Sequence, residues 1–251
     1  MGRQLVADSE SLKDLIGRLS ADADQIVVNP GDRAALAAQG IRPVEAPQPS
    51  LTAALDALFH KRRETALERA ERLPALPAAA PPAFISLYDE IRECVVFDLV
   101  GAAITLCGIL VEFTLKYATY IREVGGYAKF EPDRWDEFES ITFEPAIKRA
   151  FSAGIITTEQ AGELRGFKDT VRNPYNHYNI GKITSGFIWR NVTILDLKTR
   201  TLETKDVLVQ DDPVLQAQAK PVVDRQRLAH ILQFTDGATR ALLDAIGYAA
   251  I

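Results

Sequence analysis

The segment LVGAAITLCGILV (residues 99–111) is the longest apolar run in the chain, and it is bracketed by Asp98 and Glu112. A membrane-spanning helix needs about 20 apolar residues, so a run of this length is typical of a helix buried in a protein core. We expect one long helix from about Phe84 to Val124, because a glycine pair that favours helix termination follows it. The fold is therefore predicted to be built around a buried helix.

Two further helices are predicted after this one, over residues 144–154 and 157–172. The second begins with Thr157 and Gln160 at the spacing of a capping box, in which each side chain bonds the backbone N–H of the other residue. It should end before Pro174, since the residue preceding a proline disfavours helical geometry.

Residues 186–209 break the helical periodicity. Two β-rich stretches are separated there by KTRT, which predicts a hairpin, and a helical pattern then returns up to the end of the chain. Residues 84–251 are thus predicted to be mainly α, a helical bundle with one β-hairpin inserted before its last helix.

The segment PALPAAAPPA (74–83) contains four prolines and cannot continue a helix, so we expect a semi-rigid linker. It separates residues 1–73 from the helical segment. Within 1–73, QIVV (25–28) is typical of a short buried strand between amphipathic helices, and residues 51–73 predict a longer helix. The N-terminal segment is therefore expected to be a small α/β unit.

The composition narrows the class of protein. The 251 residues are 47% apolar, and the net charge of -5 argues against a protein that coats nucleic acid non-specifically. Residues 165–205 nevertheless contain eight basic and three acidic residues, a local balance of +5 that a basic, solvated hairpin would also explain. The N-terminus lacks the apolar region of a signal peptide. We expect a cytoplasmic protein with no membrane contact.

The two cysteines, Cys94 and Cys107, are predicted to share the long helix at a separation of roughly 20 Å, which excludes a disulfide. They are typical of small core residues in a reducing compartment. No residues occur at metal-ligand spacing around them, so neither a metal site nor another cofactor is predicted.

The segment VRNPYNHYN (171–179) combines an arginine with a histidine five residues later. If Asn173 caps a helix that opens on Pro174, free backbone N–H groups and the positive end of the helix dipole face the same anion as Arg172. His177 could then move a proton, since histidine titrates near neutral pH. An RNA 2′-hydroxyl could attack its own phosphate there without a metal. A polar turn between two helices is the alternative.

The spacing alone is not specific, because Arg225 and His230 show the same interval in the last helix. That second pair has no Asn-Pro and no helix start, so we interpret His230 as a packed or half-exposed helix residue. We interpret His60 as solvent-facing.

RNPYNH (172–177), between a helix-rich region and a final helix, resembles the R-N-x-x-x-H signature of the HEPN superfamily. The helix around GILVEFTLKYATY is also similar to an early helix of that family, which often carries an inward acidic residue, here Glu112. The resemblance covers roughly residues 84–251. It implies a metal-independent endoribonuclease that acts as a toxin or an anti-phage immune effector.

The resemblance also implies roles for residues. Two protomers would pair so that both motifs face one cleft, with Arg172 on the scissile phosphate, Asn173 as the polar residue beside it, and His177 as acid or base. Further predicted site residues are those that would bind RNA and those that would support the site: Lys168, Lys182, Arg190, Glu112 and Tyr178. Trp189 and Phe187 could stack on bases or face a core. Asn179 stands where one branch of the family has a regulatory tyrosine.

Three functions follow from these observations. The first is the ribonuclease, with RNA as its substrate, a homodimer as its active form, an antitoxin or defence-system protein as a partner, and residues 1–73 serving for partner contact or sensing. The second is a non-catalytic HEPN scaffold that binds a partner protein or a nucleotide. The third is a protein-interaction module unrelated to RNA.

Overall fold

A computed structural model describes residues 50–77, 80–196 and 201–248. The chain divides into two compact units, Met1–Glu68 and Arg69–Ile251. The elements predicted between residues 1 and 49, including the strand at 25–28, lie outside the described residues.

The described part of the first unit is helical. Helix α3 (Leu51–Glu64) begins at Ser50, whose hydroxyl accepts a hydrogen bond from the Ala53 N–H at 3.2 Å. It ends at Thr65, and α4 (Ala66–Glu71) follows and contains the boundary between the two units, so residues 51–73 form two helices where one was predicted. His60 is exposed on α3, as predicted, with its Nε2 3.3 Å from Glu64.

The centre of the second unit is a pair of helices where one long helix was predicted. Helix α5 (Pro82–Val96) and helix α6 (Val100–Val124) are separated at Asp98, which adopts a left-handed conformation with φ 58°. Few side chains tolerate this conformation, and aspartate is one of them. Cys94 therefore lies on α5 and Cys107 on α6, both as free thiols. Burial raises the pKa of the Cys107 thiol to about 12.

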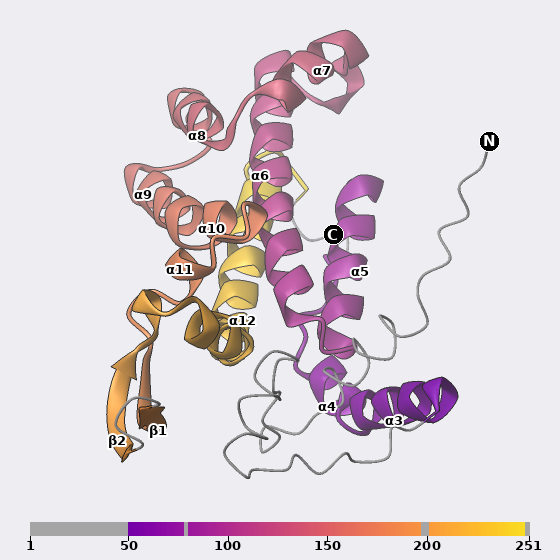
Figure 1. Ribbon diagram of the computed structural model, residues 1–251. Coiled ribbons are helices and arrows are strands. Elements are labelled where there is room, and N and C mark those ends of the chain that lie inside the picture. Colours follow the sequence, from indigo (N-terminus) through magenta and orange to yellow (C-terminus); the bar gives the residue numbers. More distant parts are fainter. Residues whose placement is uncertain (1–49, 78–79, 197–200, 249–251) are drawn as a thin grey trace, which may run out of the picture. The chain divides into compact units, whose positions relative to one another are not determined.

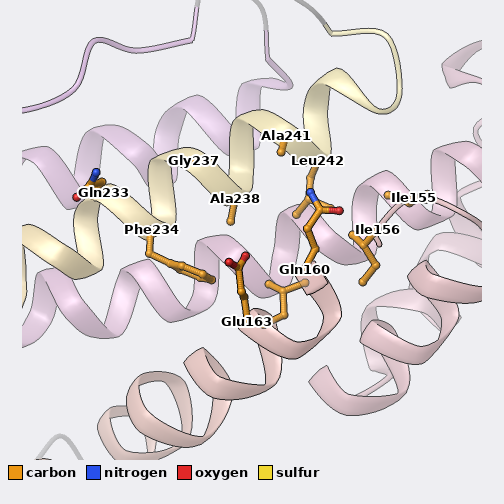
Figure 2. A pocket seen from close by; sticks show the side chains of 11 residues that line it. Ile155, Ile156, Gln160, Glu163, Gln233, Phe234, Gly237, Ala238, Ala241 and Leu242 are labelled. Carbon is orange, nitrogen blue, oxygen red and sulfur yellow. The ribbon is translucent and has the colours of Figure 1, made fainter. Parts of the chain in front are cut away.

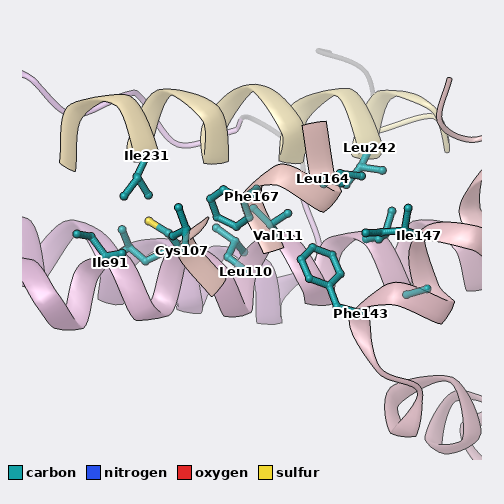
Figure 3. Close-up of a cluster of buried hydrophobic side chains, with 14 of the residues drawn as sticks. Ile91, Cys107, Leu110, Val111, Phe143, Ile147, Leu164, Phe167, Ile231 and Leu242 are labelled. Carbon is teal, nitrogen blue, oxygen red and sulfur yellow. The ribbon is translucent and has the colours of Figure 1, made fainter. Parts of the chain in front are cut away.

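Helix α6 is the core helix of this unit, with α5 and α12 beside it (Figure 1). Its buried side chains interleave with those of the surrounding helices in one apolar cluster, in which Cys107 and Leu110 meet Phe143, Phe167 and Ile231 (Figure 3). By length and composition α6 could cross a membrane, and 67% of its most apolar window is buried inside the unit, as in the core helix of a globular protein. It ends at Gly125 in a left-handed cap, as predicted.

Four short helical elements lead away from α6. In order they are η1 (Tyr127–Lys129), α7 (Pro132–Ser140), α8 (Phe143–Ser152) and α9 (Thr158–Phe167). The predicted capping box of α9 is confirmed: the Gln160 N–H donates to the Thr157 hydroxyl at 3.2 Å, and the Thr157 N–H donates to the Gln160 side chain at 2.8 Å.

The predicted hairpin is confirmed. Strands β1 (Ile188–Asp196) and β2 (Thr201–Leu208) pair antiparallel, with an irregularity in register between Trp189 and Val192. A 3-10 turn, η3 (Val209–Asp211), then leads into α12 (Pro213–Asp244), which begins at Asp212. The described residues are thus mainly α with one two-stranded hairpin (Figure 1).

The first residues of the predicted linker belong to the second unit and are bonded to two of its helices. The carbonyl of Pro74 accepts a hydrogen bond from Arg92 on α5, and the carbonyl of Ala75 accepts one from Arg240 on α12 at 2.5 Å. Side-chain anchors of this kind hold the backbone of residues 74–75 against these two helices.

Candidate functional site

The segment that contains Arg172 and His177, called here the Arg–His motif (172–177), does not open a new helix. Helix α9 continues through a π turn, η2 (Lys168–Arg172), into α10 (Asn173–Asn176). The prediction that the helix ends before Pro174 is wrong. A wide π turn directly before a proline accommodates a ring that would clash with the carbonyl four residues back in a regular α-helix.

This continuity changes the electrostatics that were predicted for the motif. The Asn173 N–H donates to the Lys168 carbonyl, so Asn173 is an interior helix residue and no N-cap. His177 lies at the C-terminal end of α10, followed by Tyr178 with φ 48°. The C-terminal end of a helix dipole favours cations, so the predicted contribution of free N–H groups and a positive dipole to anion binding does not hold.

Arg172 is held by a buried acid on the core helix. Its Nε and Nη2 atoms lie 2.8 and 2.7 Å from one oxygen of Glu112, and its Nη1 donates to the Asn173 side chain at 3.1 Å. The second oxygen of Glu112 pairs with Lys116 at 2.9 Å. The side chain of Glu112 is 11% exposed and that of Arg172 is 23% exposed. One carboxylate thus binds two cations, and the Arg172 side chain keeps part of its surface exposed to solvent.

The backbone of the motif lies against α6 at a glycine. A Cβ at Gly108 would lie 3.3 Å from the Cα of Arg172 and 3.2 Å from its Cγ. These distances are tighter than ordinary van der Waals contact, so a side chain at position 108 would require the π turn to shift by a few tenths of an ångström. The close approach sets the distance over which Arg172 reaches Glu112, one turn further along α6.

A second polar contact fixes the motif to the last helix. The Tyr175 hydroxyl donates to Asp224 at 2.7 Å, and Lys220 Nζ lies 2.6 Å from the other oxygen of the same carboxylate. Lys220 also lies over the rings of Tyr175 and Tyr178, at 5.3 and 5.5 Å. Burial and the neighbouring carboxylate raise the pKa of Tyr175, so the hydroxyl stays a donor. Sequence reasoning missed this contact, because Tyr175 and Asp224 are 49 residues apart.

His177 differs from Arg172 in its exposure to solvent and in its side-chain contacts. It is exposed, as are its neighbours Asn176, Tyr178 and Asn179. Its N–H closes the last turn on the Asn173 carbonyl at 3.1 Å, and no side-chain partner is recorded for its imidazole among the described residues. The side chain of Asn179 caps the next short helix, α11 (Ile180–Ile183). His177 is therefore free to meet a ligand or a second protomer.

Of the residues predicted to bind RNA, Lys168 is engaged elsewhere. Its Nζ lies 2.5 Å from Glu144, which also pairs with Arg165 at 3.0 Å. These two cations lower the pKa of Glu144, and the carboxylate raises the pKa of Lys168. Arg190 is exposed on β1, and among the described residues its side chain has no recorded hydrogen bond or ion pair with the motif.

Lys182 lies in a hollow that adjoins the motif. This basic hollow, of about 590 Å³, is lined by the π turn, by α11, by the loop that follows α11, and by α12: Asp169, Thr170, Val171, Lys182, Ser185, Arg227, His230 and Ile231. His230 is exposed there, more open than predicted. Sequence reasoning missed Arg227 and His230 as neighbours of Lys182, although the three-residue interval that places both on one face of α12 was visible.

A second cavity, of about 220 Å³, lies between α9 and α12 (Figure 2). It is lined by apolar groups such as Phe234 and Leu242, with Gln160 and Glu163 at its edge, and by none of the predicted site residues. Within the three described stretches of chain, no group of three histidine, cysteine or acidic side chains is arranged to hold a metal ion.

Comparison of the chain with protein-family models, with curated proteins and with solved structures finds no match in any of the three.

Proposed function

We propose that the chain is a metal-independent endoribonuclease of the HEPN type, in which Arg172 binds the scissile phosphate and His177 moves the proton. The observation that carries the proposal is the position of Arg172, whose guanidinium is held by a buried glutamate on the core helix and whose side chain is still 23% exposed. A fixed arginine binds phosphate with less loss of side-chain freedom than a mobile one.

The local charge supports anion binding at Arg172. Glu112 carries one negative charge, and Arg172 and Lys116 carry two positive charges, so the buried group retains a net charge of +1. A phosphate that approaches the exposed part of the Arg172 side chain would compensate this excess. The π turn that presents Arg172 is a local departure of a kind that occurs frequently at functional sites.

The basic hollow supports a path for the RNA strand. Lys182 and Arg227 face it against the single acid Asp169, and His230 lies at its edge. Phosphates that flank the scissile one would be neutralised there, which gives affinity without base recognition. Lys182 thereby keeps its predicted role, and Arg227 joins it.

The chemistry requires an acid and a base, and each motif supplies one histidine. We therefore propose a homodimer in which two exposed His177 side chains share one cleft, one as base toward the 2′-hydroxyl and the other as acid toward the leaving 5′-oxygen. The proton removed from the hydroxyl and the proton given to the leaving oxygen balance, and the product is a 2′,3′-cyclic phosphate. Light scattering of the full chain is expected to show a dimer.

The second candidate is a non-catalytic HEPN scaffold, and one observation favours it. The ion pair between Arg172 and Glu112 also fixes the π turn to α6, which is a structural role that needs no substrate. A scaffold of this kind would bind a partner protein or a nucleotide and leave RNA intact.

The test is incubation of the full chain with a labelled single-stranded RNA in the presence of EDTA. We expect fragments that end in a cyclic phosphate, and no cleavage of the same strand with 2′-O-methyl groups, because that strand has no attacking hydroxyl. An intact RNA strand would overturn the proposal of a ribonuclease and would favour the non-catalytic scaffold. Cleavage that EDTA abolishes would overturn the metal-independent mechanism.

A further inference from the structure

A pocket lined by aromatic rings lies at the C-terminal half of α6. This aromatic pocket has a volume of about 420 Å³. It is formed by α6, η1 and the residue that follows η1, α7, the chain around the start of α5, and Tyr248 beyond the end of α12. Its six aromatic side chains come from segments far apart in the sequence: Phe113, Tyr117, Tyr127, Phe130, Trp135 and Tyr248. Its volume lies in the range typical of small-molecule sites.

The rings form one continuous wall around Trp135. The ring centroid of Trp135 lies 6.1 Å from that of Phe113, 5.9 Å from that of Tyr117 and 6.2 Å from that of Phe130. Tyr127 continues the wall from Phe130 at 6.1 Å. Tyr117 is buried, whereas Tyr127 is 65% exposed, so the rings extend from the base of the pocket to its rim.

The charged residues that line the pocket determine which sign of charge a ligand can carry. Glu139 on α7 is the one ionised side chain among the lining residues, and no ion-pair partner of its carboxylate is recorded in the described part of the chain. Lys116, one residue before Tyr117, is turned to Glu112 at 2.9 Å and to the Glu139 carbonyl at 2.9 Å. A phosphate or carboxylate ligand would therefore meet aromatic rings and one carboxylate, with no lining cation to bind it.

We infer that the aromatic pocket binds a small organic cation that carries an alkylated ammonium group. The negative ring faces attract such a cation, its methyl groups fill an apolar space, and Glu139 compensates its charge. This inference concerns a different part of the second unit from the Arg–His motif and does not depend on RNA cleavage.

The probe is choline, titrated into the full chain by calorimetry, with 3,3-dimethylbutanol as a neutral molecule of the same shape. We expect saturable binding of choline and binding of the neutral isostere weaker by tenfold or more, because cation–π attraction requires the charge. Trimethyl-lysine amide tests whether the same group is also accepted from an amino-acid side chain. Equal binding of the isostere, or no saturable binding of choline, would overturn the inference.

Two exposed residues locate the site without disturbing the core. Glu139→Gln should weaken choline binding about fivefold, on the scale of one exposed charge pair, and Tyr127→Ala by about threefold, on the scale of one exposed cation–π contact. Glu137→Gln, an exposed acid on the same helix that does not line the pocket, is the matched control and should leave the affinity unchanged.

The two tryptophans allow an optical readout. In a Trp189→Phe background, Trp135 is the remaining tryptophan of the sequence, and its emission should change with choline along the same saturation curve as the heat. A change in heat with no change in Trp135 emission would place the cation elsewhere and overturn the assignment.

Discussion

The two ends of the Arg–His motif are five residues apart in sequence and differ in how the protein holds them. Arg172 is paired with a buried glutamate of the core helix, close to a glycine that admits its backbone. His177 lies at the exposed end of the same helical run, with its imidazole turned to solvent. The difference teaches that the arginine end belongs to the fold as much as to any chemistry, whereas the histidine end contributes almost nothing to stability.

The largest effect is expected at Glu112. Glu112→Gln leaves Arg172 and Lys116 partly buried without their counter-charge, and removal of one partner of a buried ion pair costs about 3 kcal/mol in the free energy of unfolding. Urea unfolding measures this loss. Glu137→Gln, at an exposed glutamate, is the control and should change stability by less than about 0.5 kcal/mol. Equal stability of the two variants would contradict the claim that the buried glutamate of the core helix fixes Arg172.

A smaller loss is expected at Tyr175, which joins the motif to α12. Tyr175→Phe removes the hydrogen bond to Asp224, and a hydrogen bond to a charged group contributes about 1.5 kcal/mol. Tyr178→Phe removes a hydroxyl from a side chain that is 65% exposed and should cost almost nothing. If the two variants unfold at the same urea concentration, the contact to α12 does not anchor the motif.

The ion pair of Lys168 gives a pH-dependent effect of less than about 1 kcal/mol, because its groups are partly exposed. The pKa of Glu144 is lowered in the folded state, so its contribution is complete above about pH 4.5 and is lost as the pH falls below that value. Wild type should therefore be more stable than Glu144→Gln at neutral pH, and the difference should vanish in acid. Unfolding curves at several pH values test this, and a difference that persists well below pH 4.5 would contradict it.

Lys182 is exposed, like His177, so its replacement should leave the free energy of unfolding unchanged. Lys182→Gln is expected to weaken RNA binding and to reduce the slope of log affinity against log salt concentration by about one. Fluorescence anisotropy at several salt concentrations measures the slope. Lys148→Gln, at an exposed lysine of α8, is the control. Identical slopes for the two variants would contradict the claim that RNA binds in the basic hollow.

Local signals in the sequence predicted local structure well. The capping box of Thr157 and Gln160, the end of α6 at Gly125 and the hairpin near residues 186–209 each depend on neighbouring residues, and each is confirmed. The buried position of Glu112 was expected only from the resemblance of its helix to one that often carries an inward acidic residue, because in the sequence Glu112 simply bounds the longest apolar run.

The errors arose where tertiary contacts decide. The break between α5 and α6 has no glycine or proline to mark it, and Asp98 there is bonded to Arg225, a residue of α12. The π turn before Pro174 contradicts the usual effect of proline and is held by a close approach to Gly108. The basic hollow joins Lys182 to His230, which lies 48 positions later in the sequence, and no spacing rule connects the two.

The most direct test of the account is one comparison of RNA cleavage and stability in His177→Asn. We predict that the variant unfolds at the wild-type urea concentration and that its cleavage rate falls at least about a hundredfold, the usual contribution of a general acid or base. His60→Asn, the same change at an exposed histidine of α3 outside the motif and the basic hollow, should retain cleavage within a few-fold. Wild-type cleavage by a correctly folded His177→Asn would contradict the assignment of the Arg–His motif as a catalytic site.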